Sequence, residues 1–289
     1  MVVGPNDIFQ GFLLGLLYSL IALGYNIIYR VNKSINFSFP QLVLLTVYVA
    51  LVVSAAVNII LAVVVALAVG VLVSVATERL VARPLLGRPP IALIGATLGV
   101  YYALKGVVIL VGENRVDIFP IPYKIYNLGP IVVGLNDVIA LVGSIASLYL
   151  IVVIHHKTSV GAAMRAVSED SLSAAAYGLP LKRLMVLSWV MAGLVGGLGA
   201  FLLAVKAQVS PNLEYYALRA LAASLLAGLD SVGGVVVGGI ILGITEQVAS
   251  KLLDPYLPGI GSDIAFLILL LILLVKPYGL FRSERIERV

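Results

Sequence analysis

Apolar residues along this chain are gathered into long runs, separated by short polar or charged stretches. Most of the runs approach the roughly 20 apolar residues that an α-helix needs to cross a bilayer. The pattern therefore predicts an all-α polytopic membrane protein with about eight to nine transmembrane or re-entrant helices in a compact bundle. The nine runs lie at about 8–29, 41–57, 59–81, 91–112, 137–154, 184–205, 217–229, 232–250 and 263–276.

The seventh and eighth runs leave two arrangements open. The run at 217–229 is short for a span, and the turn that follows it, Asp230 to Gly234, contains two glycines. A shallow re-entrant hairpin and a pair of tilted spans both fit this pattern. In either case the chain returns to the same side of the membrane before its last run.

Composition supports the membrane assignment. Residues of the AVILMFWYC set make up 61% of the 289 positions, and only 11% are charged. A soluble domain carries about 45–50% apolar and about 25% charged residues. Roughly 100 residues remain outside the runs, too few for the connections and an appended catalytic domain of about 100–150 residues. We therefore expect one transmembrane domain over residues 1–289.

Glycines four residues apart recur inside the runs. Such pairs allow helix backbones to approach each other in lipid, where no hydrophobic effect drives association. They predict tight helix packing within a compact bundle. The pairs are Gly11 and Gly15, Gly95 and Gly99, Gly193 and Gly197, Gly234 and Gly238, and Gly239 and Gly243.

The positive charges fall mainly on one side of the predicted membrane. Lys and Arg are enriched in cytoplasmic connections, so the distribution predicts an external N-terminus and a cytoplasmic C-terminus. The net charge of +5 reports orientation here and gives no reason to expect a nucleic-acid partner. Thirteen of the 19 basic residues share the predicted cytoplasmic side: Arg30, Lys33, Arg79, Arg83, Arg88, Lys157, Arg165, Lys182, Arg183, Lys276, Arg282, Arg285 and Arg288.

A polar stretch at about 155–183 is longer than the other connections on the predicted cytoplasmic side. Helix-forming residues run from Gly161 to Tyr177, after a capping pair and before Gly178-Leu179-Pro180, so we expect one short helix. Its spacing groups Met164, Val167, Leu172 and Ala175 on one side, with Arg165, Glu169 and Asp170 elsewhere. Two interpretations remain: a coupling helix that a cytoplasmic partner receives, or a solvated helix on the membrane surface.

Several polar side chains lie inside the apolar runs. Ionisable groups in a span are costly unless they face a partner or water. Glu246 is therefore a candidate for a transport path, with structural hydrogen bonding as the alternative. Lys105 follows Tyr101 and Tyr102, and its ammonium is expected to reach the membrane surface or to be structural. Asn26 lies near the cytoplasmic end of the first run.

The stretch from Ile35 to Gln41 interrupts the first two runs with polar and aromatic residues, among them Asn36 and Phe37. Transporters build ligand contacts at such breaks. A simple cytoplasmic turn gives the same pattern.

Motifs for chemistry are missing from the sequence. There is no G-x-x-x-x-G-K-[S/T] phosphate loop, no H-E-x-x-H and no cysteine. His155 and His156 are adjacent and so are poorly placed to hold one metal ion. No paired aspartates and no Ser-His arrangement can be assembled within the runs. We expect no catalytic residue, no metal site and no cofactor in this chain.

Four segments together resemble the LivH-type permeases of branched-chain amino acid ABC importers. Residues 15–29, with 35–37, are similar to the opening signature of that family. Residues 78–85 resemble its E-R-x-x-x-R-P-L loop, and residues 158–170 its T-x-x-G-x-A-M-R-A-x-x-x-D segment. Residues 277–281 resemble its R-P-x-G-L-F close. The matches follow the order of the family along nearly the whole chain.

Two departures from the family's motifs limit which residue roles can be transferred to this chain. LivH-type chains usually read Ile-Asn-Phe-Ala-His-Gly where this chain has Ile35-Asn36-Phe37-Ser38-Phe39-Pro40. Any role of that His-Gly pair is not carried over. A Leu-Gly-Gly-Leu-Gly-Ser stretch appears here as residues 226–231, with Asp230 adding a charge at the turn.

The resemblance implies a permease subunit in the cell membrane, working with a LivM-like permease, two cytoplasmic ATPases that bind ATP, and an extracytoplasmic binding protein. It implies translocation of branched-chain or other hydrophobic amino acids. The ATPase-coupling candidates are Gly161, Met164, Arg165, Glu169 and Asp170, and the path candidates are Tyr18, Asn26, Asn36, Phe37 and Glu246. Alternatives are urea, short amides or other amino acids as substrates, or a stand-alone ion-coupled transporter.

Overall fold

The computed structural model describes residues 2–112, 115–122 and 124–281. Each of the nine apolar runs forms a helix there, so the predicted fold class is confirmed. Seven of the helices in these ranges are long and apolar enough to cross a membrane, whereas α9 and α11 have 15 and 16 residues. The nine helices are α1 (Pro5–Asn32), α2 (Phe39–Ala56), α3 (Ile59–Thr77), α4 (Pro90–Gly112), α5 (Leu135–Lys157), α8 (Leu181–Lys206), α9 (Leu213–Ala227), α10 (Val232–Leu253) and α11 (Ile260–Val275).

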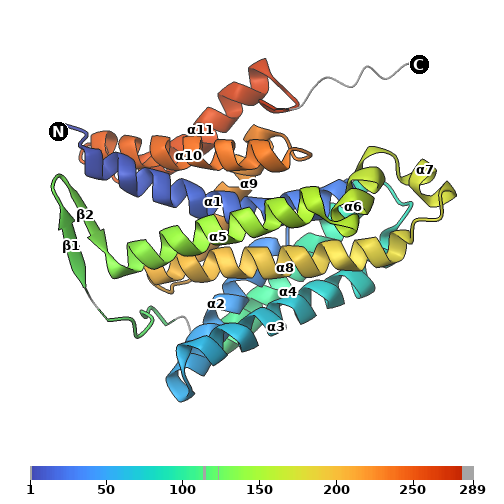
Figure 1. Ribbon diagram of the computed structural model, residues 1–289, viewed down its shortest axis with the longest axis horizontal. Helices are drawn as coiled ribbons and strands as arrows, with labels where there is room; N and C mark the ends of the chain where they lie inside the picture. Colours follow the sequence, from blue (N-terminus) through green and yellow to red (C-terminus); the bar gives the residue numbers. More distant parts are fainter. Residues whose placement is uncertain (1, 113–114, 123, 282–289) are drawn as a thin grey trace.

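Helix α1 lies at the centre of an elongated bundle. It is apolar on all sides, and 94% of its most apolar window is buried among its neighbours, chiefly α10, α8, α9 and α5 (Figure 1). The corresponding buried shares for α3, α4 and α5 are 22%, 17% and 28%. These outer helices therefore present apolar faces to whatever surrounds the chain.

Glycines allow α1 and α10 to pack closely. A Cβ added to Gly243 would lie 2.3 Å from the backbone nitrogen of Gly15, and one added to Gly239 would overlap the Ser19 hydroxyl. The predicted tight packing is present at this contact. Gly95 and Gly99 differ, because a Cβ added to either would meet no described atom within 4 Å.

The two ends of the bundle have different structures. At the hairpin end, strands β1 (Ile125–Leu128) and β2 (Ile131–Gly134) pair antiparallel beside the start of α1, a feature that the apolar pattern does not predict. At the opposite end, which we call the loop end, α6 (Ser159–Glu169) and α7 (Ser171–Ala176) project beyond the long helices (Figure 1).

The two helices of the 217–250 region, α9 and α10, differ in length. Helix α10 runs antiparallel beside α1 almost from end to end, from the Asn26 contact with the Ser231 carbonyl (3.3 Å) to the Lys251–Asp7 ion pair (3.6 Å). With 22 residues α10 is long and apolar enough for a span, whereas α9 has 15. The Leu280 and Phe281 amides donate to carbonyls at the end of α9. Arg282, Arg285 and Arg288 lie outside the described residues.

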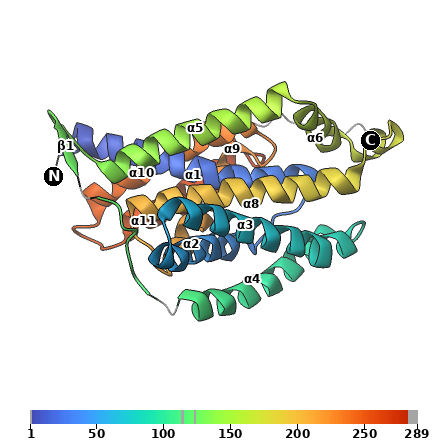
Figure 2. The ribbon, with the colours of Figure 1, turned by 60° about the horizontal axis from the view of Figure 1, so that its bottom comes forward.

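Helix α4 lies at one edge of the bundle, beside α2 (Figure 2). A π-helical turn (Glu78–Ala82) and a 3-10 turn (Arg83–Leu85) lead toward it from α3. The Glu78 carboxylate is buried and accepts two hydrogen bonds from the Arg83 guanidinium, both at 3.0 Å. The charged pair of the E-R-x-x-x-R-P-L segment thus holds this turn together.

Candidate functional site

A buried polar cluster joins α1, α9 and α10 inside the bundle. The Glu246 carboxylate accepts a hydrogen bond from Tyr18 Oη (2.7 Å) and pairs with Arg219 Nη1 (3.1 Å). The Arg219 guanidinium also lies 5.1 Å from the centre of the Tyr216 ring. Two sequence candidates, Tyr18 and Glu246, therefore meet directly. Arg219, which completes the pair, is not among the predicted path residues, because the sequence does not specify which helices become neighbours.

A second cluster joins α2, α4 and α9. The Glu214 carboxylate pairs with Lys105 Nζ (3.2 Å) and accepts hydrogen bonds from Tyr101 Oη (3.0 Å) and from Gln41. The sequence predicts that Lys105 reaches the membrane surface or is structural, and it does not predict a partner for it. The structure supplies that partner, Glu214, in the first turn of the neighbouring helix α9. The Lys105 side chain remains 42% exposed.

The break between α1 and α2 is partly buried, with Ser34, Asn36 and Ser38 enclosed by the protein. Lys33 ends α1 in a left-handed conformation, and Phe39 then inserts between Gly24 and Gly196. The Asn36 side-chain oxygen accepts from the Ser38 amide and hydroxyl, while the Phe37 amide donates to Thr97 Oγ1 (3.2 Å). Asn36 is therefore enclosed by protein rather than placed on an exposed turn.

Asn26 has a different role in the packing. Its side-chain oxygen accepts from the Ser224 hydroxyl, and its nitrogen donates to the Ser231 carbonyl. It thus ties α1 to both α9 and α10 near the turn between them. The five path candidates form no single cluster: only Tyr18 and Glu246 bond to each other.

The loop at 155–183 forms two helices rather than the single predicted one. Extended backbone at Asp170 interrupts it, and the Asp170 carboxylate caps α7 through the Leu172 and Ser173 amides (2.9 and 3.1 Å). Ser, Thr, Asp and Asn favour such caps because their side chains accept bonds from amides that have no helical partner. The predicted apolar side is consequently divided between α6 and α7.

Helix α6 is held against the rest of the chain. A Cβ on Gly161 would lie 2.2 Å from the His155 carbonyl oxygen, which also accepts from Arg165. Met164 and Val167 are buried within the chain. Since Met164 is used in this way, it offers little surface to a partner, whereas Glu169 remains exposed.

Helix α7 carries the exposed apolar surface of the loop. Leu172 is 82% exposed, and Tyr177, directly after α7, is 89% exposed. Neither residue is among the predicted coupling residues. Their exposure follows from the break at Asp170, which redirects the chain away from the side that Met164 occupies.

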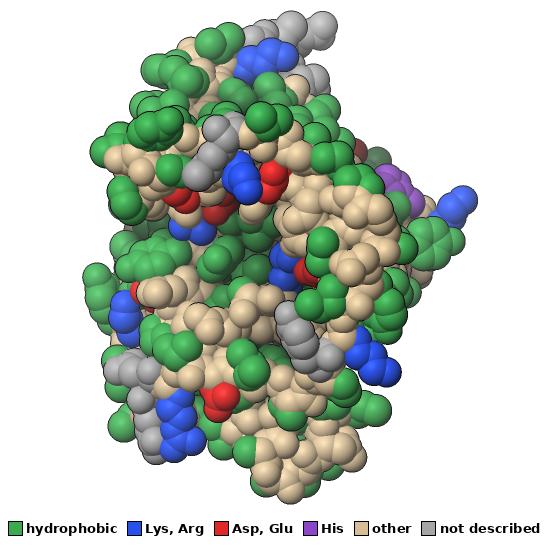
Figure 3. All heavy atoms as spheres, turned by 90° about the vertical axis from the view of Figure 1, so that its left-hand side faces the viewer, with side chains coloured by type: hydrophobic (Ala, Val, Ile, Leu, Met, Phe, Trp, Pro, Cys, Tyr) green, Lys and Arg blue, Asp and Glu red, His purple; other side chains and the backbone are tan. Residues whose placement is uncertain are grey.

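At the hairpin end, two adjoining hollows lie beside α1 and α8. One of about 330 Å³ is lined by the hairpin, Asn6 and Lys124, and the other, of about 310 Å³, reaches down to Glu246 and Tyr216. Gln10 and Lys206 line both. Figure 3 shows this face hollowed near its middle, with acidic and basic side chains beside the depression.

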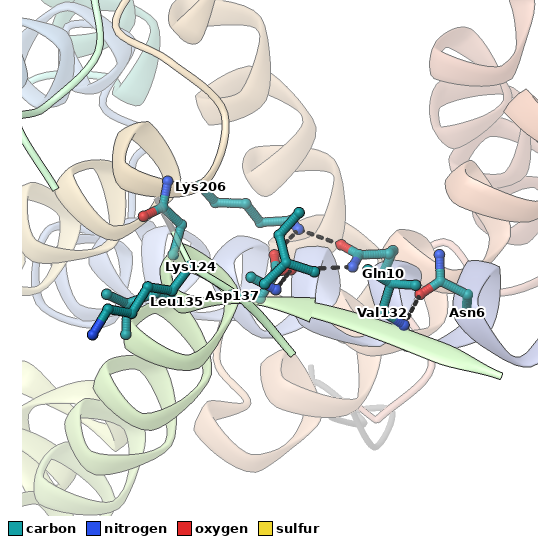
Figure 4. A pocket seen from close by; sticks show the side chains of 10 residues that line it. Asn6, Gln10, Lys124, Val132, Leu135, Asp137 and Lys206 are labelled. Carbon is teal, nitrogen blue, oxygen red and sulfur yellow. Dashed lines mark hydrogen bonds and ion pairs between the residues drawn. The ribbon is translucent and has the colours of Figure 1, made fainter. Parts of the chain in front are cut away.

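Lys206 is the centre of a small network between the hollows. Its ammonium pairs with Asp137 (2.6 Å) and donates to the Gln10 side-chain oxygen, while the Gln10 nitrogen donates to Asp137 (3.3 Å) (Figure 4). Asp137 also accepts from the Gly134 amide at the start of α5. The network links α1, α5 and α8, and the sequence gives no signal for it because these helices are far apart in the chain.

No group of three or more His, Asp or Glu residues able to hold a metal ion occurs within the described ranges. A bundle of membrane-length helices with ion pairs in its interior and a helical loop projecting at one end defines an all-α, polytopic membrane protein.

The chain belongs to the family described as the permease component of branched-chain amino acid transport systems, whose model matches residues 7–275. It is 27% identical to the high-affinity branched-chain amino acid transport permease LivH of Escherichia coli K12, over 98% of this chain and 97% of that protein. The probable LivH of Methanocaldococcus jannaschii is also 27% identical, over 96% and 93%.

A solved structure shares the fold. It is a chain of PsaBC from Streptococcus pneumoniae in complex with Fab, with a TM-score of 0.51 and 15% identity, covering 93% of this chain and 89% of that one. At this identity the likeness concerns the arrangement of helices alone.

Proposed function

We propose that this chain is the membrane-spanning permease subunit of an ABC importer and forms the path for branched-chain or other hydrophobic amino acids. ATP hydrolysis takes place in two separate cytoplasmic ATPases, and a LivM-like permease and an extracytoplasmic binding protein complete the importer. The observation that carries the proposal is the family match over residues 7–275. The lack of a phosphate-binding loop in the sequence agrees with an energy source in another chain.

In this proposal the hairpin end is extracytoplasmic and the loop end is cytoplasmic. The positive-inside rule supports this orientation, since the loop end carries Arg30, Lys33 and the basic residues that flank α6 and α7. The chain has no cysteine, so single cysteines can report it. We expect a membrane-impermeant maleimide to label Leu128→Cys in intact cells and Tyr177→Cys only after permeabilisation. The reverse pattern would contradict the orientation.

The loop end would receive the ATPase. Here Gly161, Met164 and Arg165 hold α6 in place, Asp170 caps α7, and Glu169, Leu172 and Tyr177 offer the contact surface. A small apolar surface with a charged flank suits a groove in a partner. ATP-driven motion would then reach the bundle through α6, which contacts α1, α5 and α8.

The path would follow the buried polar groups of α1, α9 and α10 and the break after α1. Polar and charged groups inside a membrane bundle are costly, and they are concentrated where substrates or ions pass. Glu246 and Tyr18 lie below the hollow at the hairpin end, and Asn26, Asn36 and Phe37 lie toward the loop end. We therefore propose these five residues as path candidates in that order.

Transport in proteoliposomes tests the substrate. The permeases, their ATPases and the binding protein are reconstituted together, and uptake of leucine, isoleucine, valine and urea is measured with and without ATP. We expect ATP-dependent uptake of the three amino acids. Uptake of urea or a short amide, without uptake of the three amino acids, would show that the amino-acid substrate is wrong. Uptake without any ATPase would contradict the proposal that the chain belongs to an ABC importer.

A further inference from the structure

The hollow that reaches Glu246 combines opposite charges with a lining that is part polar and part apolar. Lys206, at the end of α8, and Glu246, on α10, both line it. The rest of the lining is part apolar (Leu14, Leu203 and Ala207) and part polar (Gln10, Tyr216, Gln247, Ser250 and Ser262). Its volume is about 310 Å³. Sites for small molecules begin at roughly 300 Å³ and combine apolar walls with a few polar groups. The size and lining therefore suit a small amphiphilic ligand.

The charge balance of the lining limits which class of ligand the hollow can bind. Lys206 is paired with Asp137, and Glu246 with Arg219, so the lining is neutral as a whole. A ligand with a net charge would leave one charge unmatched beside these two ion pairs, which costs free energy. A zwitterion adds no net charge and still offers a carboxylate and an ammonium group.

Each charged side chain has bonding capacity left for a ligand. An ammonium group has three N–H donors, and the described acceptors of Lys206 are two, Gln10 and Asp137. A carboxylate has about four acceptor positions, and the described donors to Glu246 are Tyr18 and Arg219. The side chains can therefore keep their present partners while a ligand binds.

We infer that this hollow, between α1, α8 and α10, is a binding site for a zwitterionic amino acid with an aliphatic side chain. Lys206 binds the carboxylate, Glu246 binds the ammonium group, and Leu14, Leu203 and Ala207 contact the side chain. The inference rests on the proposed function and names a place in this subunit where the amino acid binds. The network of Lys206, Gln10 and Asp137 in Figure 4 forms the boundary with the other hollow, which the β1–β2 hairpin lines.

The test measures binding to the permease complex in nanodiscs without the binding protein. Radioactive leucine is displaced by leucine, by 3-methylbutylamine, which lacks the carboxylate, or by 4-methylpentanoate, which lacks the ammonium group. We expect the unmodified complex to prefer leucine over either analogue by about tenfold or more, since each analogue loses one charge-assisted bond.

The variants separate the two roles. Lys206→Met should lose the preference for leucine over 3-methylbutylamine and keep the preference over 4-methylpentanoate, and Glu246→Gln should do the reverse. Lys251→Met is the matched control, because Lys251 pairs with Asp7 at the same end and does not line the hollow. It should bind all three compounds normally. Unchanged preferences in both charge variants would overturn the assignment.

Ala207→Phe keeps the test decisive if a charge variant fails to fold. Ala207 lines the hollow and is exposed, so a ring fills the space without removing either charge. It should weaken leucine binding about tenfold or more while the complex assembles normally. Normal leucine binding by this variant would overturn the site.

Transport by the same complex separates this inference from the proposed function. Two results would contradict the binding site but not the proposed importer. One is ATP-driven leucine uptake without saturable leucine binding, and the other is leucine uptake that is unchanged in Ala207→Phe. If the unmodified complex transports none of leucine, isoleucine and valine, the proposed function itself is contradicted.

Discussion

Carboxylates inside the bundle have cationic partners on other helices. Glu246 pairs with Arg219, and Glu214 pairs with Lys105. Removing a charge from water costs several kcal/mol, and a partner with good geometry recovers much of that cost. At the scale of single residues, these pairs keep charge inside an apolar bundle, where it is available to a passing ligand.

The Glu246–Arg219 pair gives a prediction on stability. Arg219→Met leaves the buried carboxylate without its cation and should lower the free energy of unfolding by about 3–5 kcal/mol. The double variant Arg219→Met with Glu246→Gln should recover part of this loss, because no unpaired charge remains. Thermal unfolding in detergent measures both. Equal losses in the single and double variants would show that the pair is not coupled.

Glu246 also gives a prediction on transport. Glu246→Ala should reduce leucine uptake more than it reduces assembly with the partner subunits, because the proposed site loses its contact for the ammonium group. Uptake in proteoliposomes and co-purification measure the two quantities in one preparation. A fall in assembly as large as the fall in uptake would favour a purely structural carboxylate.

The sequence predicts the individual site residues only in part. Glu246 and Lys105 stand out because charge within an apolar run is rare. Their partners, Glu214 and Arg219, do not stand out, because they lie beside or in a short run. Lys206 and Asp137, which pair with each other, lie at the ends of two other apolar runs and do not stand out either. Pairing depends on which helices become neighbours, and hydropathy carries no information on that.

At the scale of elements, the contact between α1 and α10 depends on small residues. Gly243→Leu would drive a side chain into the Gly15 backbone and separate the two helices. We expect a strong loss of folded protein, measured by the monodisperse fraction after purification. Gly233→Leu, in the first turn of the same helix, is the control, because a Cβ there meets no described atom within 4 Å. Equal yields for the two variants would contradict the packing.

The loop end divides structural from contact residues. Leu172→Arg should weaken ATPase co-purification about tenfold without changing the melting temperature, because Leu172 is exposed. Glu169→Arg should act in the same direction. Arg165→Glu should instead lower the melting temperature, since Arg165 donates to the His155 carbonyl. Association that is unchanged in all three would exclude this loop as the coupling surface.

Element positions are well predicted where length and hydropathy decide them. All nine apolar runs became helices, with ends shifted by a few residues. The β1–β2 hairpin is missed because its strands, of four residues each, carry little periodic signal. The single helix expected at 161–177 is wrong because Asp170 caps a new helix, a local bond that outweighs helix propensity.

At the scale of the whole molecule, the bundle presents a buried centre, apolar outer helices and two different ends. Helix α1 is enclosed, and α3, α4 and α5 present exposed apolar faces to lipid or to another subunit. The two hollows lined by Gln10 and Lys206 lie at the hairpin end, and the projecting helices lie at the loop end. A substrate that arrives at one end and an ATPase that binds at the other would use these opposite features.

The most direct test of the central claim is a pull-down of the tagged chain from native membranes in mild detergent, with the co-purifying proteins identified by mass spectrometry. We expect two ATPases with phosphate-binding loops and a second, LivM-like permease. Recovery of the chain alone, stable and monodisperse, would contradict that claim.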